Sequence, residues 1–135
     1  MRILDKLSQS KDFKFLSSPG FNATIQTDSI KRINIAYRYV MENFKDQIKL
    51  DDISEEVNMT KEAFCRYFKR KTNRTFMEYV IRFRIGYACR LLMETQLNVS
   101  EIGYESGFNN LANFNRQFVK LKGLSPKAYR NRFLD

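Results

Sequence analysis

ISEEVNMTKEAFCRYFKRKTNRTFMEY (residues 53–79) and IGYESGFNNLANFNRQFVKLKGLSPKAY (residues 102–129) are two copies of one pattern, about 50 residues apart. One inserted residue, at the start of the second half of the later copy, accounts for the difference in length. Two copies are fewer than the roughly three that a solenoid needs, so the repeat predicts a duplicated small module. The matching pairs are Ile53 and Ile102, Glu56 and Glu105, Asn58 and Gly107, Met59 and Phe108, Phe64 and Phe114, Arg66 and Arg116, Phe68 and Phe118, Thr75 and Ser125, and Tyr79 and Tyr129.

Each copy has the pattern of a helix-turn-helix, in which a tight turn joins a short helix to a second helix. Asn58 and Gly107 stand at the two turns, and both residue types tolerate a left-handed backbone conformation. Two helical hairpins in an ordinary bundle would show the same pattern. In each second helix, two phenylalanines four residues apart share one face and are expected in the core, Phe64 with Phe68 and Phe114 with Phe118.

The rest of the chain also has helical periodicity, and no stretch alternates with a period of two, so we expect an all-α fold. Residues 1–27 show no helical period and are interpreted as a linker, or as the tail of a sensor domain further upstream. The expected helices are 28–44, capped by Asp28 or Ser29; 50–57; 61–71, capped by Thr60; 75–95; 98–107, with Asn98 and Glu101 as a capping box; 110–122, ended by Gly123; and 126–133, with Pro126 in its first turn.

Composition favours a polyanionic partner. Lysine and arginine number 24 against 15 aspartates and glutamates, which gives a net charge of +9. Such an excess suits nucleic acid or an anionic membrane surface. The apolar fraction of 43% is enough for a packed core. No apolar run approaches the roughly 18 residues of a membrane span, so we expect no membrane insertion.

The same composition argues against catalysis and metal binding. The chain contains no histidine, which removes most general-base schemes and most zinc or iron sites. Cys65 and Cys89 stand on separate predicted helices without the close spacing of metal or redox sites, so free thiols are expected. We therefore expect no enzyme, no metal and no cofactor.

The residues from Asn98 to Tyr129 resemble the signature of AraC/XylS-type transcription regulators. The order is Gly107-Phe108, then a Phe-x-Arg-x-Phe run from Phe114, then Gly-x-Ser-Pro-x-x-Tyr-Arg from Gly123. The resemblance covers roughly residues 29–133. It implies a seven-helix domain with two helix-turn-helix subdomains, at about 50–72 and 98–122, joined by a long helix. It also implies operator binding and control of promoters in the bacterial cytoplasm, with double-stranded DNA and RNA polymerase as partners.

The resemblance also implies which residues contact DNA. Arg66, Asn115 and Arg116 suit guanine and adenine edges best, whereas Cys65 offers only a weak contact. The implied base-reading residues are Glu62, Cys65 and Arg66 in the first recognition helix and Leu111, Ala112, Asn115 and Arg116 in the second. Outward basic or amide side chains are expected to hold phosphates, and these are Lys61, Lys69, Arg70, Asn113 and Lys120.

The joining helix sets the distance between the two recognition helices. About 20 residues make a helix of about 30 Å, close to the 34 Å of one turn of B-DNA. One chain is thus expected to enter two successive major grooves at an asymmetric site. The main alternative is a helical protein-interaction module without DNA specificity, and a membrane-surface protein is a further one. Dimerisation, if it occurs, is expected through an N-terminal domain outside these residues.

Overall fold

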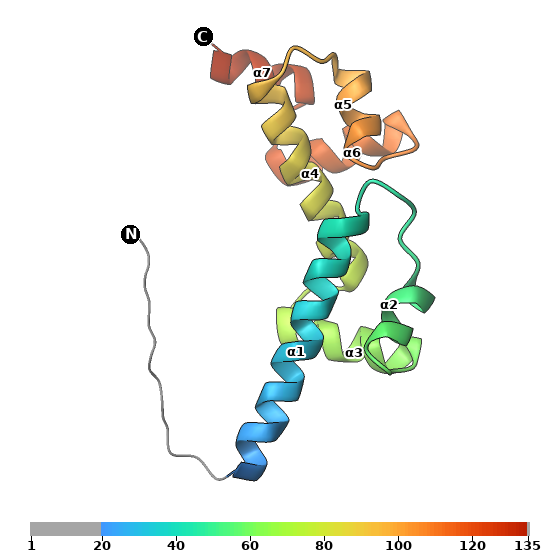
Figure 1. Ribbon diagram of the computed structural model, residues 1–135. Helices are drawn as coiled ribbons and strands as arrows, with labels where there is room; N and C mark the ends of the chain where they lie inside the picture. The colour runs from blue at the N-terminus through green and yellow to red at the C-terminus, as the bar shows by residue number, and fades with distance from the viewer. Residues whose placement is uncertain (1–19, 135) are drawn as a thin grey trace. The chain divides into compact units, whose positions relative to one another are not determined.

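The computed structural model describes residues 20–134, and in this part the chain is all-α, as predicted (Figure 1). No strand occurs among these residues. The helices are α1 (Gly20–Asn43), α2 (Leu50–Glu56), α3 (Lys61–Thr72), α4 (Phe76–Glu94), α5 (Val99–Glu105), α6 (Leu111–Lys122) and α7 (Pro126–Leu134).

The first helix begins earlier than the sequence predicted. α1 starts at Gly20, so Asp28 and Ser29 lie inside it and cap nothing, contrary to the expectation. Residues 21–27 contain neither glycine nor proline, and a helix can extend through them although their apolar residues lack a clear period. The proposed linker before Gly20 lies outside the described residues. By its contacts the described part of the chain divides between Arg32 and Ile33, and the site lies after this division.

Side chains cap the N-terminal ends of α3, α4 and α5, and the caps at α3 and α5 were predicted. Such caps are needed because the first turn of a helix has amide groups without helical partners. Thr60 caps α3, and Asn98 forms the expected capping box with Glu101 at α5. Thr75 caps α4 and forms a second capping box with Glu78, which accepts a hydrogen bond of 2.7 Å from the Thr75 amide. That bond lowers the pKa of the Glu78 carboxyl below its ordinary value.

Left-handed residues end the first and second helix of each pair. Asn58 has a φ of 60° and Gly107 a φ of 102°, so both predicted turn positions are confirmed. Asn73 and Gly123, with φ of 63° and 83°, end α3 and α6 in the same way. The repeat is therefore a repeat of backbone conformation as well as of sequence.

Residues 33–135 contain two separate apolar clusters, one in each helix-turn-helix. The four phenylalanines predicted for the core are all buried with no exposed surface, Phe64 and Phe68 in the first cluster and Phe114 and Phe118 in the second. Helix α4 belongs to both clusters: Phe76 and Val80 at its start pack into the first, and Ile85, Ala88 and Leu92 pack into the second.

The last helix is tied to the end of α4 by Arg130. Its guanidinium donates hydrogen bonds to the backbone oxygens of Leu92 (2.9 Å), Thr95 (3.1 Å) and Leu97 (2.6 Å). These carbonyls lie at or just beyond the C-terminal end of α4, where oxygens lack helical partners. Arg130 thus closes α4 and is not available for DNA.

Candidate nucleic-acid interface

Helix α3 presents a basic face to solvent. Phe64 and Phe68 are buried on one side and fix the rotation of the helix, which turns the opposite side outward. One acidic side chain, Glu62, stands in the first turn. The exposed residues of this face are Lys61, Glu62, Arg66, Lys69 and Arg70, all of which were predicted to contact DNA.

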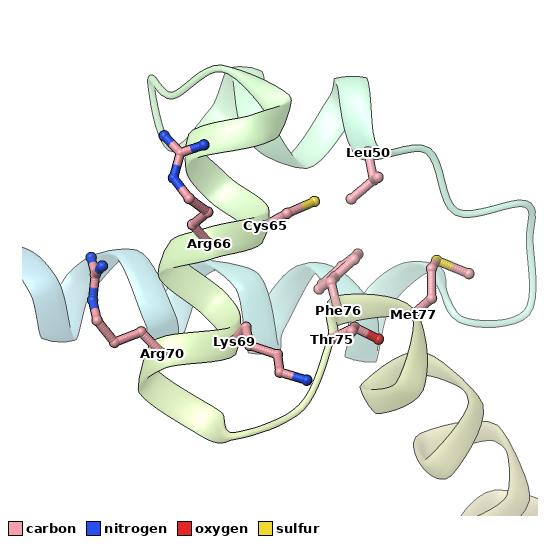
Figure 2. Close-up of a pocket in the computed structure, with 8 residues that line it drawn as sticks. All are labelled: Leu50, Cys65, Arg66, Lys69, Arg70, Thr75, Phe76 and Met77. Carbon is pink, nitrogen blue, oxygen red and sulfur yellow. The ribbon is translucent and has the colours of Figure 1, made fainter.

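Cys65 lies differently from the other predicted base-reading residues of α3. It is half-buried and lines an apolar cavity of about 460 Å³ together with Leu50, Phe76 and Met77. Figure 2 shows the thiol pointing toward Leu50, whereas Arg66 projects away from it. Cys65 is a free cysteine, as expected. Any contact it makes to a base must therefore be apolar and shallow, which leaves Arg66 as the main candidate on this helix.

Helix α6 repeats the arrangement with a different set of side chains. Phe114 and Phe118 are buried, and the exposed residues opposite them include Ala112, Asn115 and Arg116. Lys120 is exposed one turn further on. The sequence of this helix contains no acidic residue, so an approaching phosphate meets no repulsion from it.

Asn113 and Leu111, two of the residues of α6 predicted to contact DNA, make contacts within the protein. Asn113 is half-buried, and its side-chain oxygen accepts a hydrogen bond of 2.6 Å from Arg116. This bond holds the guanidinium along the helix, which reduces the rotamer freedom it must lose on binding. Leu111 is half-buried and leans toward Gly103 of α5, where an added Cβ would lie 2.9 Å from its Cδ2. Asn113 is thus an anchor for Arg116, a role that the sequence did not show, and Leu111 offers little surface to a base.

The two second helices border neighbouring depressions of the surface. Met77, at the start of α4, is 41% exposed and lines the cavity beside α3. The same side chain lines a second depression of about 540 Å³, which also includes Asn109 and Asn113 at the start of α6. Met77 therefore borders a depression beside each of the two second helices.

Other kinds of site find little support in the part of the chain that the structure describes. Residues 20–134 hold no group of three or more histidine, cysteine or acidic side chains arranged to bind a metal ion. Within the same range, no helix has both the length and the apolar character needed to cross a bilayer.

These features define a class of protein, the tandem helix-turn-helix DNA-binding domain, with two such units on one connecting helix. A family model described as "Helix-turn-helix domain" (HTH_18) matches residues 53–132. The chain belongs to this family of AraC/XylS-type transcription regulators, as its sequence signature predicted.

Similar sequences include named regulators. The chain is 31% identical to an uncharacterized HTH-type transcriptional regulator of Pseudoalteromonas carrageenovora, covering 93% of this chain and 70% of that protein. It is 31% identical to YdeC, an uncharacterized HTH-type transcriptional regulator of Bacillus subtilis, over 78% of this chain and 37% of the relative. It is 26% identical to the transcriptional activator RhaS of Escherichia coli, over 76% and 37%. The chain spans 31–40% of the length of several such relatives.

Solved structures share the fold. The C-terminal domain of the response regulator yesN from Fusobacterium nucleatum has a TM-score of 0.70 at 27% identity, covering 74% of this chain and 98% of that one. The DNA-binding domain of AdpA in complex with a target DNA has a TM-score of 0.69 at 24% identity, covering 73% and 88%. The described residues therefore share the fold of these two domains.

Proposed function

We propose that this chain binds double-stranded DNA at specific sequences through α3 and α6 and so regulates transcription. The observation that carries the proposal is the pairing of two helix-turn-helix units whose second helices both expose arginine. Arg66 and Arg116 occupy the same position of the repeat, and both are exposed. Arginine on an exposed recognition helix suits the two acceptors of guanine in the major groove. A third base contact comes from Asn115, which suits adenine.

The length of α4 supports simultaneous entry into two successive major grooves. Its 19 residues correspond to a helix of about 28 Å, somewhat shorter than the 34 Å of one DNA turn. Bending the DNA toward the protein would make up the difference, at a cost of about 1–6 kcal/mol. Because the two helices carry different side chains, the bound site is asymmetric.

Selection of bound sequences from a random duplex pool tests the proposal. We expect one asymmetric site with two conserved blocks about one helical turn apart. A pool that shows no enrichment over competitor DNA would contradict it and would favour the protein-interaction alternative.

Substituting Arg116 with alanine tests base recognition by α6. Arg116→Ala is expected to weaken binding to the selected site by about 1–3 kcal/mol and to relax the sequence preference at one position. The measurement is a titration of duplexes with each base at that position. Arg132→Ala is the control, because Arg132 is exposed, lies on α7 outside the two predicted recognition helices, and carries the same charge. Equal losses on all duplexes would show that Arg116 contacts phosphate only.

Substituting Lys120 with alanine tests phosphate contact. Lys120→Ala is expected to weaken binding to all duplexes alike and to reduce the slope of log affinity against log salt by about one unit. Lys127→Ala, an exposed change on α7, supplies the comparison. An unchanged salt slope in Lys120→Ala would remove this residue from the interface.

Further partners follow from the proposed function. A domain that selects promoter sites brings its protein beside RNA polymerase, and we propose polymerase as a partner. Activation is the mode we propose, supported by the similarity to RhaS. We propose the cytoplasm as the location, because promoter DNA is found there in bacteria. Binding DNA and regulating transcription requires neither catalysis nor a cofactor. Any dimerisation is assigned to a domain outside these residues.

A further inference from the structure

Each helix-turn-helix unit has its own apolar cluster, and α4 contributes side chains to both clusters. Val80 packs into the first cluster and Ile85 into the second, so the change from one unit to the other falls between these residues. Arg84 lies between Val80 and Ile85, at the boundary between the two units. A single helix running between two domains can bend and twist, and a second contact beside it would prevent this.

Arg84 makes that second contact with the first unit. Its Nε donates a hydrogen bond of 2.8 Å to the carbonyl oxygen of Phe44, directly after α1. Its Nη2 donates one of 2.9 Å to the carbonyl oxygen of Asp46, in the loop before α2. The guanidinium is half-buried, and desolvation lowers its pKa below the ordinary value of arginine. It remains charged at neutral pH because the ordinary pKa of arginine lies far above neutrality.

The same guanidinium contacts the second unit. It lies 5.9 Å from the ring centre of Phe108, which is buried in the second cluster. Gly107 also packs against this region, because a Cβ added to it would overlap the oxygen of Phe44 and lie 2.8 Å from Arg84 Nε. The turn of the second unit therefore touches the first unit directly. We name the five residues Phe44, Asp46, Arg84, Gly107 and Phe108 the Arg84 brace.

A neighbouring ion pair adds little to the brace. Lys45 lies 3.9 Å from Glu105, and both side chains are about half exposed. Exposed pairs at this distance contribute little, because water and salt screen them. The hydrogen bond from Arg84 to Phe44 is partly buried, whereas the one to Asp46 is exposed. The bond to Phe44 is therefore the better shielded of the two, and a partly buried acceptor left without its donor is costly. Arg84 thus links the two units by two hydrogen bonds, beside the contact of Gly107 with Phe44 and the continuity of α4.

We infer that Arg84 is a positioning residue that holds the two helix-turn-helix units at one spacing and so determines which distance between two DNA half-sites the domain accepts. The inference rests on the proposed function for its DNA part. Two binding units held rigidly bind a site of matching spacing as one, because the second contact costs little further entropy. Loosely joined units tolerate several spacings and bind the best one less tightly.

The first test uses no DNA. Residual dipolar couplings measured on the isolated chain report the orientation of each unit separately. In the wild type we expect one alignment tensor to fit both units. In Arg84→Met, which keeps the apolar stem and removes the donors, we expect the tensor of the second unit to shrink relative to the first. A single tensor in Arg84→Met would overturn the inference.

The second test uses the duplex selected by the wild type, with one or two base pairs inserted or removed between its conserved blocks. We expect the wild type to lose binding sharply on every altered spacing. Arg84→Met is expected to bind the original duplex about tenfold more weakly, a coupling of ordinary size. Its loss on altered spacings is expected to be small, and its binding to a duplex with one block is expected to match the wild type.

Controls separate positioning from loss of structure. Arg82→Met removes the same charge two residues away on α4, from an exposed side chain, and is expected to keep the wild-type spacing preference. Arg84→Lys retains the charge but not the fork of two donors, and is expected to fall between the wild type and Arg84→Met. An Arg84→Met protein that keeps the spacing preference, or that loses one-block binding as well, overturns the inference. If the wild-type chain selects no duplex, the proposed function is refuted. The residual dipolar couplings still show whether the Arg84 brace holds the two units in one orientation.

Discussion

Phe68→Ala is expected to lower the free energy of unfolding by about 3–5 kcal/mol, the usual cost of removing a fully buried phenylalanine. Phe68 has no exposed surface, and its ring centre lies 5.3 Å from that of Phe76, 5.7 Å from Tyr79 and 5.8 Å from Phe64. Removing it leaves a cavity where α1, α3 and α4 meet in the first cluster. Small domains are stable by only about 5–15 kcal/mol, so much of the stability is lost. Urea denaturation followed by circular dichroism measures the change.

Phe133→Ala is the matched control. Phe133 is 52% exposed and has an aromatic neighbour, Tyr129, at 4.8 Å. The same chemical change is expected to cost about 1 kcal/mol or less there. If both variants lost similar amounts, the assignment of Phe68 to the centre of the first cluster would be wrong.

Gly107→Ala is expected to lower the free energy of unfolding by about 3 kcal/mol or more, from two separate causes. The φ of 102° lies in a region that side chains rarely adopt. The new methyl group would also overlap the carbonyl oxygen of Phe44, a backbone atom that Arg84 holds by a hydrogen bond. Neither the turn nor the carbonyl can move without opening the Arg84 brace. Denaturation in urea measures the loss.

Two other glycines separate the two causes. Gly123 has a φ of 83° and no atom within 4 Å of an added Cβ, so alanine there is expected to cost only the backbone strain of about 1–2 kcal/mol. Gly86 lies inside α4 with open space beside it, and alanine there is expected to stabilise the chain by about 0.5–1 kcal/mol. Equal costs at Gly107 and Gly123 would show that the contact with Phe44 is unimportant.

Much of the fold could be predicted because its signals are local. The caps at Thr60, Thr75 and Asn98 act over three residues, so residue types at that spacing are enough to place a helix start. The buried phenylalanines follow from a spacing of four on one helix face. The start of α1 was misplaced because a possible cap at Asp28 says nothing about whether the residues before it are helical.

The candidate site could be predicted in part. The exposed faces of α3 and α6 follow from the positions of the buried phenylalanines, and Arg66 and Arg116 lie where expected. The cavity beside Cys65 could not be predicted from the sequence, because its walls come from three helices, α2, α3 and α4. The bond from Arg116 to Asn113 is local, but any of several polar neighbours on the helix was an equally good partner.

The sequence by itself determined the repeated helix-turn-helix pattern, the caps and turns that bound most helices, and the basic or amide side chains opposite each buried pair. All of these depend on residues a few positions apart. Only the tertiary structure decided what Arg84 and Gly107 do, because Arg84 is 40 residues from Phe44 along the chain. The path of the intervening helices brings them together, and an arginine on a helix has no local signal for a carbonyl that far away. The spacing that we propose for the two units therefore depends on tertiary packing, whereas the residues that we propose to contact bases were predicted from the sequence.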